Sequence, residues 1–126
     1  MNWLTYFEKY SSDRKLLCAV EEEIAKLERF GKESGRLMLL RATADDLRSS
    51  INDVEHFLDN YVSSASDPRE AGKRAQEMLF ISLRYRQDMS IEATAEAMGV
   101  SRDTAYRVRR RIADRGDLFS GTTSAM

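Results

Sequence analysis

The sequence predicts an all-α protein in which an N-terminal helical hairpin or coiled-coil region precedes a C-terminal three-helix module. Only one proline, Pro68, occurs among the 126 residues, so few positions interrupt a helix. Residues that favour helices, such as leucine, alanine, glutamate, arginine and methionine, are frequent. In several segments the apolar side chains recur at alternating steps of three and four residues, which places them on one face of a helix.

The first 30 residues are expected to form a short N-terminal segment followed by one helix. The segment 2–10 is rich in aromatic side chains, which we interpret as core packing by a short helix or docking segment. A Ser-Ser-Asp cluster at 11–13 is typical of an N-cap and predicts a second helix over 13–30. Cys18 on that helix is interpreted as a small buried hydrophobic residue. Two glycines predict a turn over 31–35.

The strongest periodicity in the chain covers residues 37–61, where the apolar positions form an unbroken heptad seam. An apolar stripe of this length must be covered, by the preceding helix, by a second chain, or by both. The preceding helix provides only about three turns of matching seam. We therefore expect a homo-oligomer, with a dimer favoured, and a hairpin core is the alternative. The residues predicted to form the oligomer contact are Leu37, Leu40, Leu47, Ile51, Val54, Leu58 and Tyr61.

The second half of the chain begins after a small polar linker at 63–66. Asp67 is expected to cap a helix over 68–87, with Pro68 at the first position, where the missing N–H costs nothing. The small and apolar residues expected on the buried side of this helix are Ala71, Ala75, Met78, Leu79, Ser82 and Leu83.

Residues 88–112 have the sequence form of a helix-turn-helix. Ser90 is expected to cap a short helix over 91–98, and Ser101 to cap a second helix over 102–115. Gly99 lies between them at a position where the backbone turns left-handed, which glycine does without steric penalty. The predicted division of the chain is a helical oligomerisation region at 1–64, a helix-turn-helix DNA-binding module at 67–116 and a flexible tail at 117–126.

The second helix of this motif has an apolar side and a charged side. Ala105, Val108 and Ile112 share the apolar side, and Ala95 is small enough for the two helices to cross closely. A recognition helix presents its outward side chains to the major groove. The predicted DNA-contacting residues are Ser101, Arg102, Asp103, Thr104, Tyr106, Arg107, Arg109, Arg110 and Arg111. Base reading is assigned to Arg102, Asp103, Tyr106 and Arg107. Phosphate contacts are assigned to Arg109, Arg110 and Arg111.

The charge distribution is consistent with this assignment, although the whole chain has a net charge of −1. Residues 1–66 have a net charge of −3, and residues 67–126 have a net charge of +2. Phosphates are neutralised by nearby cations, so the arginine cluster matters more than the average. A merely solvated arginine-rich face is the alternative interpretation.

The segment 83–107, LRYRQDMSIEATAEAMGVSRDTAYR, resembles the DNA-binding module of the fourth region of sigma factors. It is also similar to small phage and prophage transcription regulators of the ArpU and RinA type. This resemblance implies a regulator that acts on promoters, with its capping serine, turn glycine and small helix-crossing residue at Ser101, Gly99 and Ala95. Thr94 departs from the usual aliphatic residue and Ala105 from the usual valine, which predicts a lighter core.

Two other functions fit the same motif: a DNA-packaging subunit similar to phage small terminases, and an RNA polymerase-binding protein. We do not expect an enzyme, because the chain has no glycine-rich phosphate loop and no nucleophile with a histidine base. No cofactor is expected, and His56 has no His or Cys partner at metal-ligand spacing. The chain lacks a secretion signal and a long apolar stretch, so we expect a cytoplasmic protein.

Overall fold

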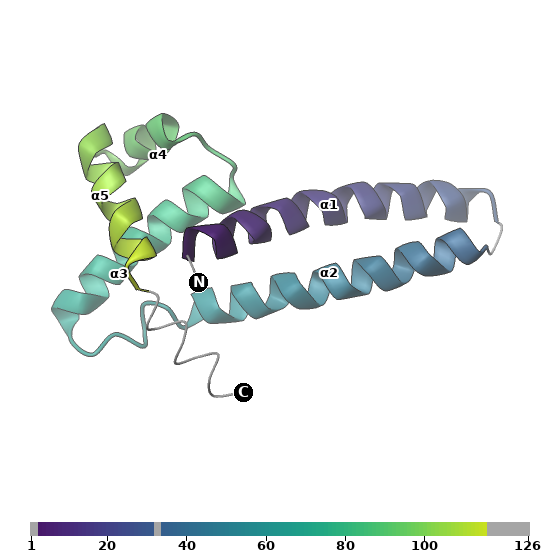
Figure 1. Ribbon diagram of the computed structural model, residues 1–126, viewed down its shortest axis with the longest axis horizontal. Helices are drawn as coiled ribbons and strands as arrows, with labels where there is room; N and C mark the ends of the chain where they lie inside the picture. The colour runs from purple at the N-terminus through teal and green to yellow at the C-terminus, as the bar shows by residue number, and fades with distance from the viewer. Residues whose placement is uncertain (1–2, 32–33, 116–126) are drawn as a thin grey trace.

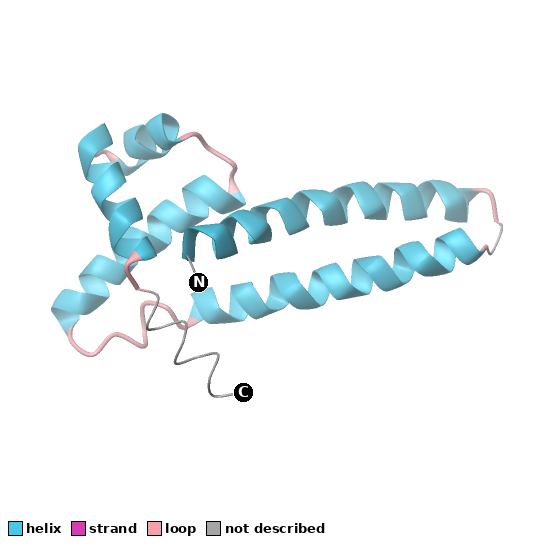
Figure 2. Cartoon of the chain, viewed as in Figure 1, coloured by secondary structure: helices cyan, strands magenta, loops and turns pink. Residues whose placement is uncertain are grey.

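The computed structural model describes residues 3–31 and 34–115, and this part of the chain contains helices and no strand. Two long antiparallel helices form a hairpin, and the remaining helices gather at its open end (Figure 1). Short loops connect them (Figure 2). The predicted all-α fold is confirmed. The helices are α1 (Trp3–Arg29), α2 (Gly35–Asp59), α3 (Pro68–Ile81), the π-helical turn η1 (Ser82–Arg86), α4 (Ile91–Met98) and α5 (Arg102–Ala113).

The predicted tail at 117–126 lies outside the described residues. None of the helices described is long and apolar enough to cross a membrane.

Residues 3–29 form one helix, α1, so the predicted start of a new helix at 13 was wrong. Asp13 lies inside this helix, where its carboxylate accepts a hydrogen bond from Lys9 Nζ at 2.7 Å. The physical reason is burial, since α1 buries apolar side chains both before this cluster, at Phe7 and Tyr10, and after it, at Val20. A serine or aspartate cap stabilises a helix end by about 1 kcal/mol. Full burial of one large apolar side chain contributes about 1.5–3 kcal/mol, so the continuous face prevails over the local capping signal.

The prediction that Cys18 is buried was also wrong, because its side chain is exposed. Its neighbours Leu17 and Val20 lie on the side of α1 that packs against α2, which leaves Cys18 on another side of the helix.

The heptad seam of α2 packs against α1 within a single chain. Leu37, Val54 and Leu58 are buried, and Leu40 and Leu47 are half-buried. The expectation that the preceding helix is too short to cover the seam was therefore wrong, because α1 has 27 residues and α2 has 25. Salt bridges from Arg36 to Glu23 and from Arg48 to Glu21, each 3.1 Å, link the same two helices.

Helix α3 ends at Ile81 and continues directly into η1, which ends at Arg86, close to the predicted end at 87. Of the residues predicted on its buried side, Leu83 is buried and Met78 packs against the core, but the rest of the prediction fails in part. Ala75 and Leu79 are exposed, whereas Arg74 and Glu77 are buried. The prediction failed because it counted only apolar side chains as candidates for burial. Oppositely charged side chains can be buried when they pair with one another.

The hairpin and the C-terminal helices share one apolar core. The ring of Phe7 on α1 stacks on the ring of Tyr85 in η1, with centroids 5.8 Å apart. The aromatic N-terminal segment is thus core packing, as expected. The buried members of this core are Phe7, Tyr10, Val54, Leu58, Phe80, Ile81, Tyr85, Ala95, Ala105, Val108 and Ile112.

A polar contact joins the same elements beside the core. Glu55 on α2 accepts hydrogen bonds from the Tyr10 hydroxyl and from the Arg86 guanidinium. Arg14 on α1 donates to the backbone carbonyl of Arg86 at 2.8 Å. The start of α1, the end of α2 and η1 are therefore held together by both apolar and polar contacts.

Candidate nucleic-acid interface

The turn between α4 and α5 has the geometry that its sequence predicts. Ser90 Oγ accepts a hydrogen bond from the backbone N–H of Ala93 at 3.1 Å, which caps α4. Gly99 has φ +70° and ends α4 in the left-handed conformation. Ser101 Oγ accepts from the N–H of Thr104 at 3.1 Å and caps α5. These local contacts fix the position at which α5 begins.

The apolar side of α5 packs inward as predicted, since Ala105, Val108 and Ile112 are all buried. Thr94, which replaces the usual aliphatic residue, is fully buried on α4. Its hydroxyl donates to the carbonyl of Ser90 at 2.8 Å, so the buried polar group is satisfied. The core therefore accepts a threonine at this position without an unpaired hydroxyl.

The opposite side of α5 is open to solvent. Tyr106 is 41% exposed despite its size. Arg109 and Thr104 are half-buried at the edges of this side, and Thr104 and Ser101 also serve the cap. The predicted contact residues that are exposed on α5 are Arg102, Asp103, Tyr106, Arg107 and Arg110.

Arg102 also has a partner on α4. Its guanidinium lies 3.2 Å from the Glu92 carboxylate, and both side chains are more than half exposed. An exposed ion pair of this kind contributes about 0–1 kcal/mol. The pair therefore places Arg102 at the junction of α4 and α5, but it is weak enough for a stronger partner to replace Glu92.

Arg111 is turned away from the exposed side, which differs from the phosphate contact predicted for it. Its Nε donates to Glu77 Oε2 at 2.7 Å, and its Nη2 donates to Gln76 Oε1 at 2.7 Å and to the carbonyl of Lys73 at 3.2 Å. All three partners lie on α3. In this structure Arg111 joins α5 to α3.

Arg111 belongs to a buried ionic cluster that was not predicted from the sequence. Glu77 is fully buried and also accepts hydrogen bonds from Arg115 and from the hydroxyl of Tyr61. A second carboxylate, Glu70, lies 2.6 Å from Arg115 Nη1. No local sequence signal marks these residues, because Glu77 is 38 positions from Arg115.

The arginines of this cluster stabilise the ionised form of Glu77. Burial alone would raise the pKa of Glu77, but hydrogen bonds from Arg115, Tyr61 and Arg111 hold that pKa below its ordinary value. Burial and the contact with Glu77 raise the pKa of the Tyr61 hydroxyl. Glu77 is therefore ionised at neutral pH and Tyr61 is protonated.

Residues 71–119 match the family model of a homeodomain-like domain. The matched range contains most of α3, all of η1, α4 and α5, and residues outside the described part. This part of the chain is therefore similar to homeodomain-like domains, and its last two helices form a helix-turn-helix. Such a domain indicates a DNA-binding protein. The chain matches no curated protein and no solved structure.

Among the described residues, no group of three or more His, Cys, Asp or Glu side chains is arranged to hold a metal ion.

Proposed function

We propose that the chain is a sequence-specific, DNA-binding transcription regulator, of the phage or prophage type that its resemblance implies. One observation carries this proposal. The exposed side of α5 presents guanidinium groups and an aromatic hydroxyl to solvent. The helix that carries them is fixed by its N-cap and by the burial of its apolar side.

The dimensions and chemistry of α5 suit the major groove. Its 12 residues give a length of about 18 Å, and the groove is about 12 Å wide. Arg102 and Arg107 can each donate two hydrogen bonds to a guanine edge, and Asp103 can accept from a cytosine amino group. Arg110, which points away from the apolar side, is suited to a backbone phosphate.

The charge of the hairpin favours an orientation in which α5 faces the DNA and the hairpin does not. The exposed acidic residues of α2 repel phosphates, and the turn of the hairpin lies at the end remote from α4 and α5 (Figure 1). The hairpin therefore projects away from the duplex when α5 enters the groove. The exposed acidic residues of α2 are Asp45, Asp46, Asp53 and Asp59.

The proposal is tested by selecting bound duplexes from a random DNA pool at about 0.15 M salt, where specific contacts outlast non-specific ones. We expect one motif to be enriched, with two half-sites about one helical turn, roughly 34 Å, apart. An enriched motif identifies the operator. A pool that stays random, although the protein is folded, contradicts sequence-specific binding and favours a packaging or polymerase-binding role.

A further inference from the structure

We propose that Glu77 is a positioning residue that limits DNA affinity by holding Arg111 and Arg115 away from DNA phosphates. This inference rests on the proposed DNA-binding function and deepens it. Glu77 itself does not touch DNA, because its side chain is 0% exposed. It acts through the two arginines that it binds.

The contacts of Glu77 account for both guanidinium groups. Arg111 Nε lies 2.7 Å from Oε2, Arg115 Nε lies 2.6 Å from Oε1, and Arg115 Nη2 lies 2.9 Å from Oε2. Glu70 adds a second carboxylate at 2.6 Å from Arg115 Nη1. Each of the two cations thus has a carboxylate of the chain as a partner, in the role that a DNA phosphate plays for an unpaired arginine.

This arrangement divides the arginines of α5 and its C-terminal end into two groups. Arg111 and Arg115 bind α3, while Arg107 and Arg110 are exposed. Arg111 lies at the border between the groups, because its side chain is still 32% exposed and it follows Arg107 by one helical turn. A rotation of this side chain towards solvent places its charge beside that of Arg107.

A packing role alone does not require a carboxylate here. Well-packed apolar residues replace a buried ion pair with little loss of stability, and sometimes with a gain. What a carboxylate adds is a fixed place for each guanidinium. The carboxylate also keeps two arginines from neutralising DNA phosphates and so from releasing counterions. Non-specific affinity and its salt dependence increase with the number of phosphates that a protein neutralises.

The test compares Glu77→Gln with the parent chain on a duplex of random sequence between about 0.05 and 0.2 M salt. We expect Glu77→Gln to bind more tightly at low salt and its log–log salt slope to steepen by about 0.9 for each guanidinium released. Over this range one released guanidinium makes the affinity fall about 3-fold more. Thermal unfolding recorded in parallel should show a lower Tm, because the buried network is weakened.

Two controls separate release of the arginines from simpler effects. Glu96→Gln removes the same charge from the exposed side of α4 and should leave the salt slope unchanged. In the double variant Glu77→Gln, Arg111→Ala, the salt slope should be close to that of the parent chain again. A Glu77→Gln slope equal to or shallower than that of the parent chain, with the Tm lowered, means that Glu77 is purely structural and overturns the inference.

A second variant serves if Glu77→Gln does not fold. Arg111→Gln in the parent chain should leave the salt slope unchanged, since Glu77 already keeps Arg111 from the phosphates. A slope shallower by about 0.9 means that Arg111 contacts DNA, and the inference is then wrong. If the parent chain itself does not bind duplex DNA at 0.05 M salt, the proposed function and this inference fail together. If the parent binds and only the variant slopes disagree, the inference alone fails.

Discussion

Arg110 and Arg111 are neighbours in sequence, yet the turn of about 100° per residue sends their side chains to different sides of α5. Arg110 is exposed, and Arg111 reaches Glu77 on α3. A run of arginines predicts a basic surface but does not reveal which members have carboxylate partners elsewhere in the fold. Neighbouring arginines of α5 therefore have different roles, which depend on the side of the helix on which each lies.

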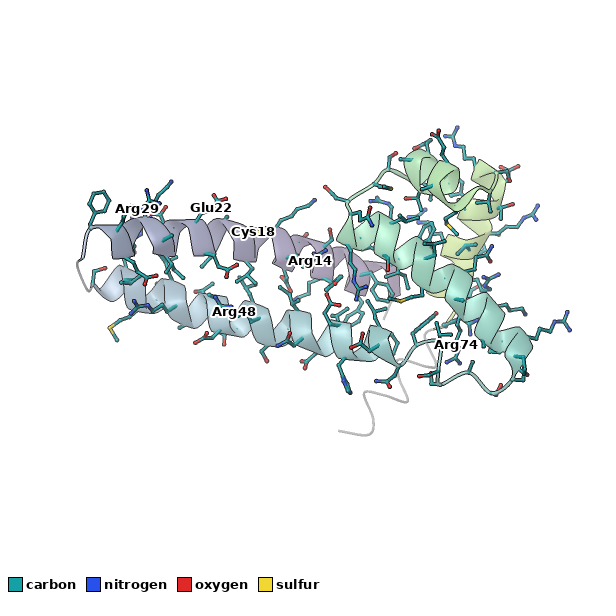
Figure 3. All side chains as sticks on the ribbon, turned by 180° about the vertical axis from the view of Figure 1, so that it is seen from behind. Arg14, Cys18, Glu22, Arg29, Arg48 and Arg74 are labelled. Atoms are coloured by element: carbon teal, nitrogen blue, oxygen red, sulfur yellow. The ribbon has the colours of Figure 1, made fainter. Side chains whose placement is uncertain are left out.

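Arg110→Ala should weaken binding to every duplex and make the salt slope shallower by about one unit, because one phosphate contact is lost. Binding to a selected operator and to a random duplex, each measured over a range of salt, gives both quantities. Arg29→Ala is a matched control. Its side chain is exposed near the turn of the hairpin, far from α5 (Figure 3). A parental slope for Arg110→Ala rejects the phosphate contact.

Arg102→Ala should change sequence preference rather than overall affinity. A lost bidentate contact costs about 1–3 kcal/mol of discrimination at one base position. Stability should fall little, because the pair with Glu92 is exposed. Repeating the duplex selection with this variant shows whether one position of the motif relaxes. An unchanged motif assigns base reading to other residues.

Among the elements, the two caps and the turn of the helix-turn-helix could be predicted because their signals are local. Ser90, Gly99 and Ser101 act on the backbone within three or four residues of themselves. The length of α1 and the buried side of α3 could not be predicted in the same way. Both depend on contacts between residues far apart in sequence, such as Phe7 with Tyr85 and Glu77 with Arg115.

Gly99→Val should destabilise the domain through the backbone alone. No atom lies within 4 Å of a Cβ built at this position, so a clash is not the cause. The left-handed conformation at φ +70° costs an ordinary L-residue about 1–2 kcal/mol, and a β-branched one is particularly unsuited to it. Chemical unfolding measures the loss.

Gly72→Ala is the control for Gly99→Val. Gly72 also has open space around it, but it lies inside α3 without a positive φ. Alanine should therefore stabilise that helix by about 0.5–1 kcal/mol. If both variants lose stability equally, the turn is not held by the left-handed residue.

For the whole molecule, the shared core joins the hairpin to the helix-turn-helix. Phe7→Ala, on the first helix of the chain, should destabilise the protein by about 3–5 kcal/mol and reduce DNA binding through unfolding. Leu16→Ala on the same helix is the control, because that side chain is 50% exposed. Helical content and DNA binding should be lost in one coincident transition. Two separate transitions would show that the helix-turn-helix folds without the hairpin.

The same packing bears on how many copies of the chain act together. The seam that was expected to join two chains is covered by α1, and its leucines Leu37 and Leu58 have almost no exposed surface left. Side chains buried within one chain do not contribute apolar area to a second interface. We therefore expect the free chain to have a solution mass near 14.5 kDa at micromolar concentration, with two copies meeting only on a two-part operator. Light scattering with and without the selected duplex measures both states. A free mass of twice this value identifies a dimer contact at another surface, and a ring of about eight copies favours the packaging role.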